Sequence, residues 1–197
     1  MGESKLTESF LLVAIPSGSV RALAEYLRTN IQQRYPIYGT VEPPFHFAVE
    51  LVRPANSEEV RLAIQTIQSV TATLPPFDLT VRGYHFFGSP YLAICLAVER
   101  SPVVEHLSRT LFDELSSQGI RVRDSYDKWE FHITVASIHG AIRPWSEAEF
   151  KEAAKWVSEI WAEASCVVEE LYLWGAQYDP DIDVRASFHL EGRQTNG

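Results

Sequence analysis

Two histidines, one in each half of the chain, share a local pattern that can support acid–base chemistry. His46 and His132 each follow a Phe, in segments where apolar and polar residues alternate as in a half-buried strand. Because side chains alternate along a strand, Ala48 shares the face of His46 and Thr134 shares the face of His132. An imidazole titrates near about pH 6.5, so a facing pair can hold one neutral and one protonated ring. The pattern predicts a general base opposite a general acid, with the Thr134 hydroxyl binding a small anionic group.

The elements that must position these residues alternate between strands and helices. Short apolar or alternating segments predict strands at 10–15, 45–51, 77–81, 91–98, 131–135, 167–174 and 184–190. Apolar residues at helical spacing predict helices over 20–31, 60–67, 104–115 and 150–160. No Pro-, Gly- or Ser-rich linker divides the chain, so we expect residues 1–197 to form a single α+β domain with about four helices and about seven strands.

Local residues predict where the helices and one turn lie. Each helical pattern has a Ser near its start, and one has a Gly just beyond its end. The expected helix-start residues are Ser17 or Ser19, Ser57, Ser101 with Pro102, and Ser146 with Glu149 in a capping box. We expect the third helix to end at Gly119 and an Asp-Pro-Asp turn to lie at 179–181.

Charge and hydropathy exclude several classes of protein. The chain has 17 Lys and Arg against 26 Asp and Glu, a formal net charge of −9. This balance argues against a protein that coats long nucleic acid or an anionic membrane. It is compatible with a protein that binds a small anionic ligand in a local pocket. The apolar run at 10–15 is shorter than the roughly 18 residues of a membrane helix, and no signal peptide is visible. Cys95 and Cys166 predict buried thiols in a cytoplasmic protein, with a single disulfide as the less favoured alternative.

Several residues outside the two motifs are candidates for substrate binding. Arg123 and Lys128 lie in a polar loop before the second motif and can steer a phosphate, although a solvated mixed-charge loop explains them equally well. Tyr126 and His85 are candidates for stacking on a base, with edge packing as the alternative for His85. Glu50 shares the face of His46 under strict alternation and can tune its pKa, but an exposed strand carboxylate is the simpler interpretation.

The six histidines also raise the question of a metal. The sequence has no His-Glu-x-x-His, no Cys/His cluster and no acidic Ca²⁺ loop, so we predict no required metal and no cofactor. A second His-x-Ser pattern begins at His106, but it lies in a helical segment where successive side chains diverge, and we expect this histidine to be solvent-exposed.

The two motifs and the order of elements resemble the two-histidine (2H) phosphoesterase superfamily, which includes 2′-5′ RNA ligase-like proteins and cyclic nucleotide phosphodiesterases. The resemblance runs from the strand at Phe10 to Leu190. Members carry two His-x-Thr/Ser motifs; the second matches fully here and the first only at its histidine, because Ala48 stands in place of the hydroxyl residue. The resemblance implies a bilobal, pseudo-twofold α+β fold with antiparallel sheets lining a central cleft and helices outside.

The resemblance also implies a function. It predicts metal-independent hydrolysis of the 2′,3′-cyclic phosphate of a nucleotide or RNA end, in which one histidine deprotonates water and the other protonates the departing ribose oxygen; their assignment stays open. Thr134 would bind the phosphate. The hydroxyl missing at Ala48 removes one hydrogen bond to the charged phosphate, which costs about 1.5 to 3 kcal/mol of interaction free energy. The alternative is a non-catalytic nucleotide- or RNA-end-binding protein on the same fold. A third, weaker interpretation is an RNA ligase or RNA-processing factor. We expect a monomer whose partner is a small cyclic phosphodiester or an RNA terminus.

Overall fold

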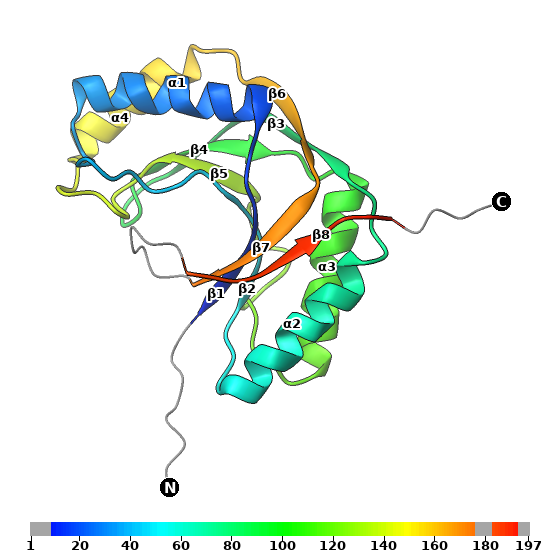
Figure 1. Ribbon diagram of the computed structural model, residues 1–197. Helices are drawn as coiled ribbons and strands as arrows, with labels where there is room; N and C mark the ends of the chain where they lie inside the picture. Colours follow the sequence, from blue (N-terminus) through cyan, green and yellow to red (C-terminus); the bar gives the residue numbers. More distant parts are fainter. Residues whose placement is uncertain (1–8, 176–182, 193–197) are drawn as a thin grey trace, which may run out of the picture.

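The computed structural model describes residues 9–175 and 183–192 (Figure 1). Within these ranges the chain forms helices and strands in a mixed order, in agreement with the predicted α+β class. The strands are β1 (Phe10–Ala14), β2 (Phe47–Val52), β3 (Phe77–Phe87), β4 (Ala93–Val98), β5 (His132–Ala136), β6 (Glu163–Val168), β7 (Glu170–Gly175) and β8 (Val184–His189). The helices are α1 (Gly18–Arg34), α2 (Ser57–Thr71), α3 (Pro102–Ser117) and α4 (Glu147–Ser158).

All eight described strands belong to one antiparallel sheet in the order β6-β3-β4-β5-β2-β1-β7-β8. The sheet divides into two groups of four, which meet where β5 lies beside β2. Helices α1 and α4 pack on the group that contains β3 to β6, and α2 and α3 pack on the group that contains β2 and β8 (Figure 1). The predicted pseudo-twofold arrangement is therefore confirmed, with the two sheets joined into one at the β2–β5 seam.

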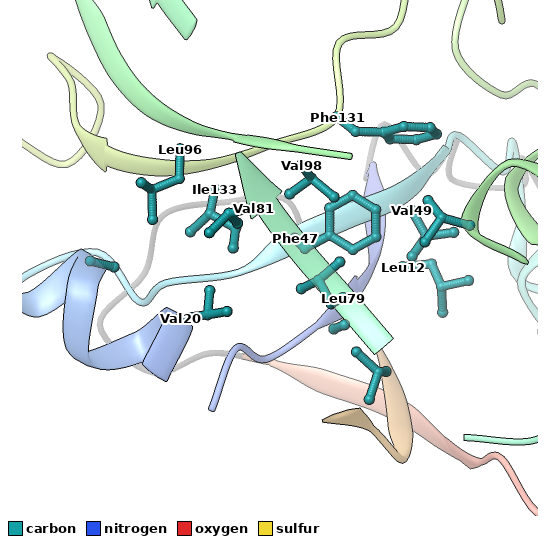
Figure 2. Close-up of a cluster of buried hydrophobic side chains, with 14 of the residues drawn as sticks. Leu12, Val20, Phe47, Val49, Leu79, Val81, Leu96, Val98, Phe131 and Ile133 are labelled. Carbon is teal, nitrogen blue, oxygen red and sulfur yellow. The ribbon is translucent and has the colours of Figure 1, made fainter. Parts of the chain in front are cut away.

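The hydrophobic core fixes which way the two histidine strands face. Phe47 of β2 and Phe131, just before β5, are 0% and 2% exposed, and their rings meet edge to face with centroids 5.5 Å apart (Figure 2). Ile133 of β5 is also fully buried in this cluster. Burying one such side chain stabilises the fold by roughly 1.5 to 3 kcal/mol. Because neighbouring side chains point to opposite faces of a strand, these apolar anchors turn His46 and His132 away from the core.

Each histidine strand contains a β-bulge at the same place. In β2, Leu12 of β1 pairs with Glu50 and Val13 pairs with Ala48, which leaves Val49 as the extra residue. In β5, Ile94 pairs with Ala136 and Cys95 pairs with Thr134, which leaves Val135 extra. Both bulges therefore lie three residues after a histidine. A bulge inserts one residue into a strand and so shifts the alternation of side chains beyond it.

The bulge in β2 corrects the prediction for Glu50. We expected an exposed carboxylate, but Glu50 is 0% exposed. The extra residue at Val49 reverses the alternation, so Glu50 turns to the inside and leaves the face of His46.

Most of the remaining elements agree with the local patterns. The capping box is present, with the Ser146 hydroxyl accepting from the Glu149 amide at 3.2 Å, and Gly119 follows α3 with φ of 78°. Asn56 caps α2 in place of Ser57. The segment predicted as one strand at 167–174 belongs to two strands, β6 and β7, which separate at Glu169 and lie in different groups of the sheet.

The other differences are small. β3 extends to Phe87, beyond the predicted 77–81. Cys95 and Cys166 are buried free thiols, so the disulfide alternative is wrong. The predicted turn at 179–181 lies outside the described residues. No helix in the described ranges is long and apolar enough to cross a membrane.

Candidate active site

The two histidines meet at the β2–β5 seam. Phe47 pairs with Ile133 across this antiparallel seam. Extending the register by one residue in each direction sets His46 opposite Thr134 and Ala48 opposite His132. The side chains of all four lie on the face opposite Phe47, and all four residues are half-buried. The sequence pattern alone predicted the two faces, and the seam joins them into one site.

Each imidazole is held by the same kind of hydrogen bond. Nδ1 of His46 lies 3.1 Å from the carbonyl oxygen of Pro44, and Nδ1 of His132 lies 2.6 Å from the carbonyl oxygen of Glu130. A carbonyl oxygen only accepts, so Nδ1 must carry the hydrogen in each case. This leaves Nε2 of both rings as the nitrogen that accepts a proton when the ring is neutral and donates one when it is charged.

Aromatic side chains cover both rings. Trp174 of β7 packs against His46 with ring centroids 5.4 Å apart, and Phe87 of β3 packs against His132 at 5.2 Å. Each aromatic comes from the same group of strands as its histidine. Together with the Nδ1 hydrogen bonds, these contacts limit rotation of the two rings.

The electrostatic surroundings of the two rings differ. Burial lowers the pKa of His46 below its usual 6.5, and repulsion from His132 and Arg28 lowers it further, against the hydrogen bond to Pro44. Burial also lowers the pKa of His132, where His85 acts in the same direction while the backbone and carboxylate of Glu130 oppose it. Both rings are therefore mainly neutral at pH 7. A phosphate anion between them favours the charged form of one.

A cavity of about 450 Å³ opens beside His132. Its polar lining can bind an anion and its aromatic lining can stack on a base. The lining residues are Phe87, Tyr91, Ala93, Lys128, Trp129, Glu130, His132, Thr134, Ser137 and His139. Of the candidates predicted from sequence, His132, Thr134 and Lys128 line this cavity.

The hydroxyl of Thr134 is prepared to donate to a ligand. Its oxygen accepts from the thiol of Cys95 at 3.6 Å. Burial raises the pKa of Cys95 to about 12, so the thiol keeps its hydrogen at neutral pH. Because the Thr134 oxygen already accepts from the thiol, its own hydrogen is available to an acceptor in the cavity.

Arg123 and Tyr126 do not line this cavity, contrary to their predicted role. Arg123 is 4% exposed and lies 3.1 Å from Glu50, and it donates to the Ser108 hydroxyl at 2.7 Å and to the Val49 carbonyl at 3.2 Å. Tyr126 is 6% exposed beside Arg123, and its hydroxyl donates to a backbone carbonyl. The loop that carries both residues folds inward, where the Arg123 guanidinium lies against Glu50 and Ser108.

His85 lies next to the cavity. Its Nε2 is 3.6 Å from a carboxylate oxygen of Glu130, and its ring packs near Phe87. His85 therefore acts on the residues that surround His132. His106 is exposed on α3, as expected.

Sequence reasoning missed Tyr91, Ser137 and His139 in the lining. Ser137 and His139 follow the second motif closely, but a β-bulge lies between, so strand alternation gives no reliable signal for them. Among the described residues, no group of three or more His, Cys, Asp or Glu side chains is arranged to hold a metal ion.

Comparisons with known proteins agree with this architecture. The family model described as the 2′-5′ RNA ligase superfamily matches residues 49–179, which include the second motif and begin just after the first. The comparison with curated proteins gives no match.

Solved structures share the fold. TT0787 of Thermus thermophilus is 17% identical with a TM-score of 0.67, over 94% of this chain and 99% of that one. LigT of E. coli complexed with 3′-AMP is 14% identical with a TM-score of 0.61, over 93% and 98%. LigT complexed with phosphate is 14% identical with a TM-score of 0.58, over 95% and 99%. The family model covers well over half of the chain, and on that match the chain belongs to the 2′-5′ RNA ligase superfamily, the two-histidine phosphoesterases.

Proposed function

We propose that this protein is a metal-independent phosphodiesterase that hydrolyses the 2′,3′-cyclic phosphate of a nucleotide or an RNA end. The observation that carries the proposal is the pair of imidazoles at the β2–β5 seam, each with Nδ1 bound to a carbonyl and Nε2 left for proton transfer. A binding site for an anion needs no such pair of proton carriers. The complex of LigT with 3′-AMP supports a nucleoside monophosphate as the product class.

The proposed reaction opens the ring by attack of water on phosphorus. One imidazole takes a proton from the water at Nε2 as the oxygen–phosphorus bond forms. The other gives its Nε2 proton to the ribose oxygen as the phosphorus–oxygen bond breaks. The Thr134 hydroxyl donates to a phosphate oxygen, where negative charge increases in the transition state.

The cavity supports an assignment of the two roles. Its aromatic lining lies on the side of His132, so a base bound there holds its ribose next to that ring. His132 is then the acid that protonates the departing ribose oxygen, and His46, across the seam, is the base. The carboxylate of Glu130, which favours the charged form of His132, supports the same assignment.

The test is turnover of 2′,3′-cyclic nucleoside monophosphates in EDTA, with separation of the 2′- and 3′-phosphate products. His46→Gln and His132→Gln should each lower kcat by about 100-fold or more. His106→Gln, at an exposed position on α3, is the matched control and should leave the rate unchanged. Turnover at the wild-type rate in either motif variant would refute the two-histidine mechanism.

The residual activity of the variants tests the two roles. The wild type should give a bell-shaped dependence of kcat/KM on pH, in which the base sets the acidic limb and the acid sets the basic limb. His46→Gln should lose the acidic limb and His132→Gln the basic limb. The reverse pattern would exchange the roles.

The second candidate is a nucleotide- or RNA-end-binding protein without turnover. It is favoured by Ala48, since one of the two hydroxyls of the 2H pattern is absent opposite His132. In that case 3′-AMP binds and the cyclic nucleotide stays intact. The proposed site of action is the cytoplasm, where a small cyclic phosphodiester or an RNA terminus is the partner.

A further inference from the structure

A buried arginine on α1 contacts the backbone close to both histidine motifs. Arg28 is 4% exposed. Its Nε donates to the carbonyl of Val135 at 2.7 Å and one terminal nitrogen donates to the carbonyl of Thr134 at 3.2 Å, both in β5. The other terminal nitrogen donates to the carbonyl of Pro43, three residues before His46. One rigid, planar group thus joins the segment that leads into the first motif to the strand of the second.

The side chain before His46 is held by the same group. The guanidinium lies over the ring of Phe45, 3.7 Å from its centroid, which is close enough for a cation–π contact. The carboxylate of Glu42 lies 3.7 Å from Arg28 and balances its charge in part. The loop before β2 is therefore held to Arg28 by the Phe45 ring, by a carbonyl and by an ion pair.

The seam between the motifs needs such support. The ladder between β2 and β5 consists of the single pair Phe47 and Ile133, whereas the flanking pairs of strands run over several residues. A short ladder restrains the separation of two strands weakly. Arg28 adds hydrogen bonds on both sides of the seam, two or three residues from each histidine.

The other group of strands contains a partial counterpart. Arg123 donates to the carbonyl of Val49, the bulge residue of β2, as Arg28 donates to the carbonyl of Val135, the bulge residue of β5. Each bulge carbonyl three residues after a histidine is thus held by a buried arginine. Of the two, Arg28 contacts both motif segments.

We propose that Arg28 is a positioning residue that sets the separation and orientation of His46 and His132. The proposal rests on the proposed function, in which both Nε2 atoms act on one phosphate. Three of the five N–H groups of Arg28 donate to backbone carbonyls, and the side chain is 4% exposed. Arg28 therefore acts through the backbone of the two segments and not by contact with the substrate. Displacing a reacting group by about 1 Å can cost about 100-fold in rate.

The first test separates positioning from stability. Arg28→Lys keeps the charge but replaces the planar fork by one rotatable ammonium, which cannot reach both segments in the same geometry. We expect kcat to fall by about 10- to 100-fold, with KM changed less than about 3-fold, at a temperature where circular dichroism shows a folded protein. The matched control is Ile31→Val, one turn further along α1 and 1% exposed, which should lower Tm by about 2–4 °C and leave kcat unchanged.

The second test does not depend on activity. NMR titration of the ring protons gives the pKa of His46 in the wild type and in His132→Gln. Removing His132 should raise the pKa of His46, because their repulsion lowers it. In the Arg28→Lys background this rise should be smaller, since repulsion weakens as the rings move apart.

The outcomes distinguish the two proposals. If the wild type does not cleave the cyclic nucleotide, the proposed function fails, and the coupling between the two histidines still tests Arg28. An equal coupling in both backgrounds would overturn the positioning role, as would a wild-type kcat in a folded Arg28→Lys protein.

Discussion

Restoring a hydroxyl at position 48 tests whether the phosphate lies between the two motifs. The register places residue 48 opposite His132, as Thr134 lies opposite His46. Ala48 is half-buried on the face of β2 that it shares with His46, and a β-branched side chain suits a strand. Ala48→Thr therefore adds a donor at the position that is symmetric to Thr134.

The expected size of the effect follows from the charge of the ligand. A hydrogen bond to a charged group contributes about 1.5 to 3 kcal/mol. At about 1.36 kcal/mol per tenfold change, a bond that forms fully in the transition state raises the rate by about 10- to 150-fold. A bond that forms equally with the bound substrate lowers KM and leaves kcat unchanged.

The assay is kcat/KM for a 2′,3′-cyclic nucleotide in EDTA. Ala48→Val is the matched control, because Val has nearly the shape of Thr without its hydroxyl. We expect Thr to raise kcat/KM by about 10- to 150-fold over Val, and Val to stay near the wild type. Equal rates for the Thr and Val variants would show that no phosphate oxygen approaches position 48, and the proposed substrate pose would then be wrong.

Other changes have defined outcomes. Thr134→Val should lower kcat/KM by about 10- to 150-fold in the same assay, because a charged phosphate loses one donor. Burial raises the pKa of Glu50 from 4.5 to about 7, so the folded state holds the proton more tightly and wild-type stability falls as pH rises from about 4.5 through about 7. Glu50→Gln should lack this fall, about 3 kcal/mol in the free energy of unfolding, when urea unfolding at about pH 4.5 and about pH 8 is compared with the wild type. Ser146→Ala removes the capping box of α4 and should cost about 1 kcal/mol, seen as a Tm lower by about 2–4 °C in a thermal melt.

The features that were predicted correctly from the sequence depend on residues that lie close together in the chain. The Ser146–Glu149 capping box involves residues within one turn, and the alternation around Phe47 and Ile133 follows from burying one face of a strand. Such signals lie within a few residues and can be recognised before the fold is known. The two faces with His46 and His132 were predicted in the same way.

What the sequence did not predict depended on distant partners. The bulge at Val49 is defined only by pairing with β1, so strict alternation gave the wrong side for Glu50. Arg123 is buried against Glu50, so the inside position of one residue could not be predicted without that of the other. Arg28 gave no signal in the sequence, because its partners are backbone carbonyls far along the chain.

The two halves of the site differ in a way that favours an enzyme over a binding protein. Both halves carry the parts that orient an imidazole for proton transfer: an Nδ1 hydrogen bond to a carbonyl, an aromatic cover and a bulge three residues beyond. The two halves differ in the hydroxyl that would contact the phosphate, because Thr134 provides one and Ala48 does not. A protein that only binds an anion needs the contacts to the anion and has no use for two oriented Nε2 atoms. Here the proton carriers are complete and one anion contact is missing, which is the balance expected of a catalyst with weakened phosphate binding.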